Sequence, residues 1–158
     1  MDKKVIRNKA GLYAVIYTVF GLIFSFLLLV VAARLSPTIG ALFIFLAEFE
    51  YDLGFKIGFL SLLVISYILG NKAYFEISEK HKNKYITSYL YGVFSILISS
   101  LFYNLTRLIL YDDVVDLDFQ SIYIFVCRPI FIGLILGLPS IFLFGTMFAR
   151  QLARWTTK

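Results

Sequence analysis

The sequence of 158 residues has little charge, one cysteine and one histidine, and each shortage excludes a class of protein. Only 16% of the residues are charged, compared with about a quarter in a typical soluble domain. The single cysteine, Cys127, excludes an intramolecular disulfide and any metal site built from several cysteines. The single histidine, His81, has no second ligand or acidic dyad near it in the sequence, so it gives weak support for chemistry.

Motifs for catalysis and cofactor binding are also missing. We find no glycine loop that would cradle a phosphate, no HExxH motif, no Ser-His-Asp set that could lie on one side of a membrane, and no paired acids in an apolar run. Aspartate and glutamate are absent from the centres of the long apolar runs, whereas proton-driven transport normally needs carboxylates within the membrane. We therefore expect a protein that is not an enzyme and holds no cofactor or metal.

What the sequence has in excess is apolar residues, which make up 60% of the chain and give a mean hydropathy of +0.85. A chain of this size cannot bury so many apolar side chains in its own core, so the surplus must face lipid. Residues 11–33 carry no charge, and as a helix they would be roughly 34 Å long, enough to cross a hydrocarbon core of about 30 Å. This length favours a first membrane span over a cleaved signal peptide, whose apolar region is usually about 7–15 residues.

Three further apolar runs predict spans at about residues 54–70, 85–110 and 125–148. Pro37 breaks the chain after the first span, and the apolar part of residues 38–52 is too short to cross, so this stretch is interfacial or re-entrant. The expected fold is all-α, a polytopic membrane protein that forms one four-transmembrane-helix bundle. Its single domain covers residues 1–158, with a cytoplasmic loop at 71–84 and outer segments at 34–53 and 111–121.

The distribution of charge predicts the orientation of the chain. The N-terminal tail, the 71–84 loop and the C-terminal tail together hold eleven lysines and arginines against three acids, whereas the remaining segments hold four against seven. Cytoplasmic loops attract lysine and arginine. The sequence therefore predicts a multi-pass membrane protein with both termini in the cytoplasm. An arrangement with three or five spans would break this agreement.

Four cations fall near the predicted outer ends of the four spans, beside an acidic loop between the third and fourth. Long basic side chains can reach the interface from such positions. Two interpretations stay open: four separate interfacial anchors, or a charged outer cluster that senses a membrane perturbation or docks an outside partner. The residues are Arg34, Lys56, Arg107 and Arg128, with Asp112, Asp113, Asp116 and Asp118.

Small residues recur at four-residue spacing in every predicted span, which places them on one helix face and lets helices approach closely in lipid. The contacts could lie inside one bundle or between subunits, and we favour a homo-oligomer, plausibly a tetramer. Asn104 is expected to form a hydrogen bond between helices. The pairs are Gly21/Ser25, Gly54/Gly58, Ser88/Gly92, Ser95/Ser99 and Gly133/Gly137.

The predicted cytoplasmic side carries a cluster of basic residues. One interpretation is a solvated run of charge, and the other is a surface that docks an acidic cytoplasmic partner or anionic lipid. Direct binding of nucleic acid is not expected, because the cations are placed as in an oriented membrane protein. The candidate docking residues are Lys80, His81, Lys82, Lys84, Arg150 and Arg154.

The start MDKKVIRNK, the basic EKHKNK of the third polar segment, the acidic YDDVVDLDF and the four-span layout together resemble KwaA over the whole chain. KwaA is the small membrane subunit of the bacterial Kiwa anti-phage defence system. The resemblance implies an inner-membrane oligomer that responds to phage attack and works with KwaB, a soluble DNA-binding partner. The basic cytoplasmic side would then be the docking surface for KwaB, by position.

The leading hypothesis is thus a non-enzymatic sensor or anchor subunit of an anti-phage defence complex. An immunity protein against a pore-forming bacteriocin is the first alternative, because such proteins include four-span examples with the same orientation. A small oligomeric ion channel is the second, with Ser95, Ser99, Ser100 and Asn104 around a pore. A toxin gene beside this one would favour the first alternative.

Overall fold

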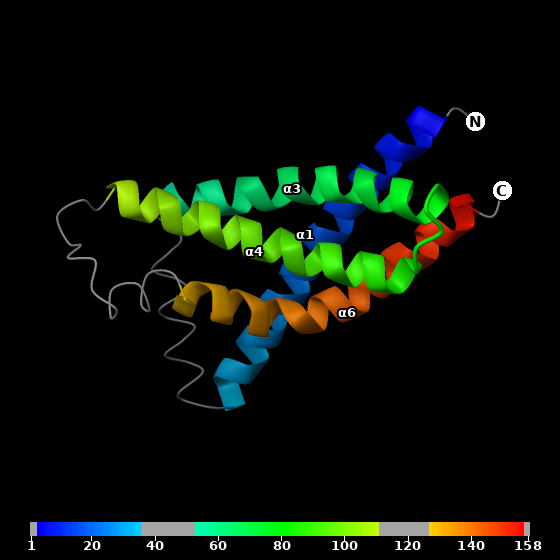
Figure 1. Cartoon of the computed structure of the whole chain (residues 1–158). Helices are drawn as coiled ribbons and strands as arrows, with labels where there is room; N and C mark the ends of the chain where they lie inside the picture. Colours follow the sequence, from blue (N-terminus) through cyan, green and yellow to red (C-terminus); the bar gives the residue numbers. More distant parts are fainter. Residues whose placement is uncertain (1–2, 36–52, 111–126, 157–158) are drawn as a thin grey trace.

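The computed structural model describes residues 3–35, 53–110 and 127–156. These residues form four long helices and no strand, and Figure 1 shows how they are arranged. The prediction of an all-α fold is therefore confirmed for this part of the chain. The helices are α1 (Lys3–Leu35), α3 (Leu53–Ser78), α4 (Lys84–Leu110) and α6 (Arg128–Thr156).

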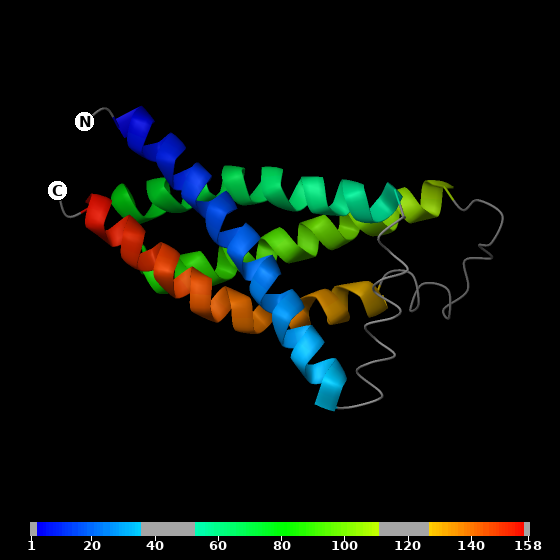
Figure 2. The same ribbon diagram turned by 180° about the vertical axis from the view of Figure 1, so that it is seen from behind.

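Each helix packs against two neighbours, in the cyclic order α1, α3, α4, α6 and back to α1. Helix α1 crosses the other three obliquely, as the view from behind shows (Figure 2). The start of α1, the connection between α3 and α4 and the end of α6 lie at one end of the bundle (Figure 1). Segments that are far apart in sequence therefore share one end.

Three stretches of the described residues are long and apolar enough to cross a membrane: Val5–Val31, Lys56–Ser78 and Lys84–Thr106. Many of their large apolar side chains are exposed, among them Phe20, Ile23 and Phe26 on α1. Exposed apolar surface on this scale is costly in water and ordinary in lipid. The structure thus supports a transmembrane helical protein. The fourth predicted span, residues 125–148, falls mainly on α6, which has 29 residues, and stays a prediction.

The connection between α3 and α4 is shorter than the predicted loop at 71–84, because α3 continues to Ser78. Residues 71–78 of the segment predicted as a cytoplasmic loop are therefore helical. Ala73, Tyr74 and Ile77 form a buried stripe at helical spacing, and they pack into the hydrophobic core at this end of the bundle. Polar residues around them, such as Lys72 and Glu76, hid the apolar stripe in the sequence.

The short turn between α3 and α4 is held by local hydrogen bonds. His81 has a φ of 50°, in the left-handed region, which allows the chain to reverse over few residues. The Asn83 Oδ1 atom accepts hydrogen bonds from the backbone N–H groups of Tyr85 and Ile86, at 3.0 and 3.3 Å. Asn83 therefore caps the N-terminus of α4. Helix α6 continues through Pro139, where the sequence predicts a kink.

Candidate functional site

The start of α1, the α3–α4 turn and the end of α6 share one end of the bundle (Figure 1), and each of these segments carries basic residues. We call this set the basic end. The structure brings the six predicted docking residues to this end, together with three cations of α1 and α3 that we did not assign to docking. Of all these side chains only Lys84 is half-buried, and the others are exposed. The basic end consists of Arg7, Lys9, Lys72, Lys80, His81, Lys82, Lys84, Arg150 and Arg154.

A buried carboxylate is built into the basic end. Glu76 on α3 is only 8% exposed, and its Oε2 atom lies 3.1 Å from the Lys82 Nζ atom. The Tyr91 phenol of α4 donates a hydrogen bond to the same carboxylate. Lys72 lies over the ring of Tyr91, with its Nζ atom 5.9 Å from the ring centre. Lys82 therefore holds the turn against the bundle, while Lys80 and Arg150 point their charge to the outside.

The pair of Lys82 and Glu76 predicts an asymmetry between two mutants. Lys82→Met leaves a carboxylate in a mostly buried place, whereas Glu76→Gln leaves an ammonium that is half exposed and can be hydrated. We expect Glu76→Gln to lower the free energy of unfolding by about 1 kcal/mol and Lys82→Met by about 2 kcal/mol. Equilibrium unfolding of the purified mutants in mixed micelles measures both values. Equal losses, or a larger loss in Glu76→Gln, would contradict the assignment.

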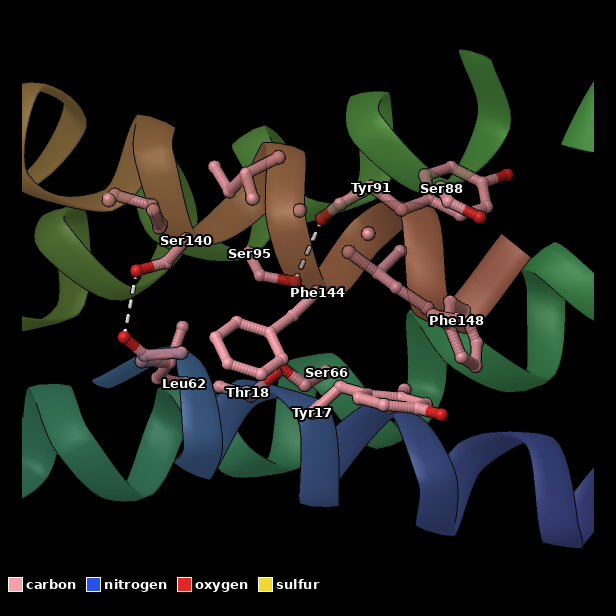
Figure 3. A pocket seen from close by; sticks show the side chains of 18 of the residues that line it. Tyr17, Thr18, Leu62, Ser66, Ser88, Tyr91, Ser95, Ser140, Phe144 and Phe148 are labelled. Carbon is pink, nitrogen blue, oxygen red and sulfur yellow. Dashed lines mark hydrogen bonds between the residues drawn. The ribbon is translucent and has the colours of Figure 1, made fainter. Parts of the chain in front are cut away.

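A cavity of about 120 Å³ lies in the middle of the bundle, and all four helices line it (Figure 3). Hydroxyl groups join the helices around it. The Thr18 hydroxyl donates to the Ser66 Oγ atom at 3.0 Å, which joins α1 to α3. The Ser140 hydroxyl donates to the Gly21 carbonyl at 2.8 Å and lies 2.6 Å from the Ser25 Oγ atom, which joins α1 to α6. The wall of the cavity thus carries hydroxyl groups that join α1 to α3 and α1 to α6.

The predicted small-residue positions lie at contacts between helices of this one chain. A Cβ atom at Gly21 would lie 3.4 Å from the Ser140 Cβ atom on α6, and one at Gly58 would lie 3.0 Å from the Tyr103 Cβ atom on α4. Gly92 faces Ile141 in the same way, and both Gly133 and Gly137 face Ile96. Gly54, Ser88, Ser95, Ser99 and Asn104 are buried. These positions are explained by packing within the bundle, so they do not by themselves indicate a contact between subunits.

The serines proposed for a channel pore also face the inside of the single chain. Ser95 donates a hydrogen bond to the Tyr91 carbonyl at 2.9 Å, and Ser99 donates to the Ser95 carbonyl at 2.6 Å. Ser100 lies beside Gly133 of α6. A pore between subunits would need such hydroxyls on an outer face. The arrangement therefore does not favour the channel hypothesis.

Sequence reasoning missed a close contact between helix backbones, where α1 crosses α3. A Cβ atom at Gly70 would lie 2.9 Å from the Ala10 carbonyl oxygen and 3.1 Å from the Gly11 Cα atom. The Gly11 N–H group donates a hydrogen bond to the Asn71 Oδ1 atom at 3.1 Å. Ser66 and Gly70 have the four-residue spacing of the pairs that we did identify, and so do Ala10 and Ala14. Both glycines were taken as ends of spans, which hid this signal.

The proposed outer cluster is only partly within the described residues. Arg34 and Lys56 are exposed at the opposite end of the bundle from the basic end. Arg107 and Arg128 lie on α4 and α6 near that same end. The aspartates at 112, 113, 116 and 118 lie outside the described residues, as do the segment 38–52 and the outer segment 111–121. The cluster therefore stays a prediction.

Comparison with known proteins adds no further assignment, since no family, no curated protein and no solved structure matches this chain. Within residues 3–35, 53–110 and 127–156, no group of three or more His, Cys, Asp or Glu side chains could hold a metal ion. The candidate functional site is therefore the basic end, and its function has to be argued from charge and position.

Proposed function

We infer that this chain is a membrane-anchored sensor or anchor subunit, not an enzyme, and that its basic end docks an acidic soluble protein in the cytoplasm. The observation that carries this proposal is the gathering of exposed cations from three distant segments at one end of a bundle whose sides are apolar. A partner on that end would meet positive charge from α1, α6 and the α3–α4 turn together. Complementary charge speeds and orients such docking.

The proposed topology has four spans with both termini in the cytoplasm. A chain whose two termini lie on the same side of a membrane must cross that membrane an even number of times. Helix α6 has 29 residues and would be about 43 Å long, enough to serve as the fourth span. The excess of lysine and arginine at the shared end favours the cytoplasm for that end.

Reporter fusions test this topology. We expect a fluorescent reporter that matures only in the cytoplasm to be bright at either terminus. Alkaline phosphatase, which is active only outside the cytoplasm, should be inactive at both termini and active when fused after Leu35 or after Leu110. Phosphatase activity at the C-terminus, with the fusion present at normal level, would overturn the four-span arrangement.

The partner in this proposal is a soluble protein with an acidic face. The resemblance to KwaA suggests a DNA-binding effector like KwaB, and hence a complex for anti-phage defence in the inner membrane, with the membrane subunit forming a homo-oligomer. A protein that binds DNA through one face can dock a basic surface only through another, acidic face. The partner would therefore bind DNA and dock to the basic end through two different surfaces.

Purification from native membranes tests the proposal. At low salt we expect the chain to co-elute with a soluble partner in a fixed stoichiometry. We expect about 0.5 M salt to release that partner, because salt screens exposed charges. Reconstitution of both proteins in lipid without net charge should preserve binding. A peak that contains this chain alone at low salt would contradict the proposal.

A further inference from the structure

The interior cavity has the size of a site for a small organic molecule. Its volume of about 120 Å³ is close to that of an engineered apolar cavity of about 150 Å³ that stays dry and binds benzene. Apolar side chains such as Leu62, Ile96 and Phe144 form much of its wall (Figure 3). The cavity is only partly enclosed, so a molecule outside the bundle has a route into it.

Several hydroxyl groups around the cavity donate their hydrogens to other protein atoms. Thr18 donates to Ser66 at 3.0 Å, Ser95 donates to the Tyr91 carbonyl at 2.9 Å, and Ser140 donates to the Gly21 carbonyl at 2.8 Å. Because Ser140 already donates to a carbonyl, Ser25 is the donor in the pair of Ser25 and Ser140. The oxygen lone pairs are what these side chains can still offer to an occupant.

A wall of this kind selects the chemistry of its occupant. Hydroxyl oxygens can accept a hydrogen bond, so they stabilise a molecule that brings a donor. A metal ion or an ammonium group would need charge compensation, and none of the described residues that line the cavity is a carboxylate. The apolar side chains favour a molecule whose body is apolar. Thr18, Ser88 and Ser95 each donate one hydrogen bond and, among the described residues, accept none. Of these three, Ser95 is the one that is both buried and near the middle of its helix, so we take it as the acceptor.

We propose that this cavity binds a small apolar molecule with one hydrogen-bond donor, of the type of phenol, with the Ser95 Oγ atom as acceptor. The molecule enters from the bilayer, and the site is separate from the basic end, so the inference does not depend on docking. Tyr91 belongs to both places: it lines the cavity and donates to Glu76 beside Lys82. Tyr91 therefore connects a molecule in the cavity to the Glu76–Lys82 ion pair at the α3–α4 turn.

Phenol and toluene give the sharpest test, because they have nearly the same shape and differ in the donor. Equilibrium dialysis measures their binding to the protein in lipid nanodiscs, with empty nanodiscs to subtract partition into lipid. Expressed as concentrations in the lipid, the dissociation constant of phenol should be at least about threefold lower than that of toluene, as expected for one hydrogen bond. Equal constants, or no saturable binding of phenol, would overturn the proposal.

Two alanine mutants on the same helix face test the role of Ser95. Ser99 lies one turn further along α4 and forms the same type of bond to its own helix, but it does not line the cavity. Ser95→Ala should lose the preference for phenol over toluene, whereas Ser99→Ala should keep it. A preference that survives in Ser95→Ala, or that disappears in both mutants, would rule out Ser95 as the acceptor.

Discussion

Gly70→Ala is expected to lower the free energy of unfolding by about 3 kcal/mol. The added methyl would meet the Ala10 carbonyl oxygen at 2.9 Å and the Gly11 Cα atom at 3.1 Å, and it would also meet the Ala14 Cβ atom. These are mostly backbone atoms of α1, which cannot rotate away as a long side chain can. Helix α1 must therefore separate from α3, and the Gly11–Asn71 hydrogen bond at 3.1 Å would break with it. Equilibrium unfolding in mixed micelles measures the loss.

Gly21→Ala is the matched control for that mutant. It makes the same chemical change in α1, but its Cβ atom would lie at ordinary contact distances, 3.4 Å from the Ser140 Cβ atom and 3.7 Å from the Phe144 Cδ2 atom. Alanine also stabilises a helix by about 0.8–1 kcal/mol relative to glycine, at either site. Gly21→Ala should therefore be neutral or slightly stabilising. If the two mutants unfolded alike, the close crossing of α1 and α3 would be wrong.

The helices could be predicted from the sequence because a long apolar run has few other structures open to it. In lipid every backbone N–H and C=O group must be paired within the segment, so runs such as residues 11–33 and 85–110 become helices. Their observed limits differ from the predicted ones mainly where a polar segment extends a helix. The stretch 71–78 is such a case, because Ala73, Tyr74 and Ile77 are buried by contacts that the local sequence does not show.

Which helix faces meet could not be predicted from spacing alone. Gly21/Ser25 and Ser66/Gly70 have the same four-residue spacing, yet the first pair faces α6 and the second pair faces α1. The choice depends on how each helix is rotated and on the oblique crossing of α1, which are properties of the whole bundle. The cavity has the same origin, since it exists only where four helix faces leave room between them. The position of the basic residues was predictable, because four helices that run back and forth bring both tails and the α3–α4 connection to the same end of the bundle.

The second large effect is expected from reversal of charge at the basic end. Lys80→Glu combined with Arg150→Glu changes the charge of the docking surface by four units, through two exposed residues on different segments. We expect the affinity for the soluble partner to fall about 100-fold, which is about 2.7 kcal/mol, because like charges then face each other across the interface. Co-purification at low salt and titration in nanodiscs measure it. Lys82 is left unchanged, since a glutamate there would face the Glu76 carboxylate and disturb the fold.

Arg34→Glu combined with Lys56→Glu is the control for this reversal. It makes the same change in net charge through two exposed residues at the opposite end of the bundle. If the basic end is the docking surface, this control binds the partner as the unmodified chain does. An equal loss in both double mutants would show that net charge alone governs the association. The reporter at each terminus must stay cytoplasmic in both, because moved charges can also reorient a membrane protein. With orientation held constant, a loss confined to the Lys80 and Arg150 mutant assigns the docking surface to the basic end.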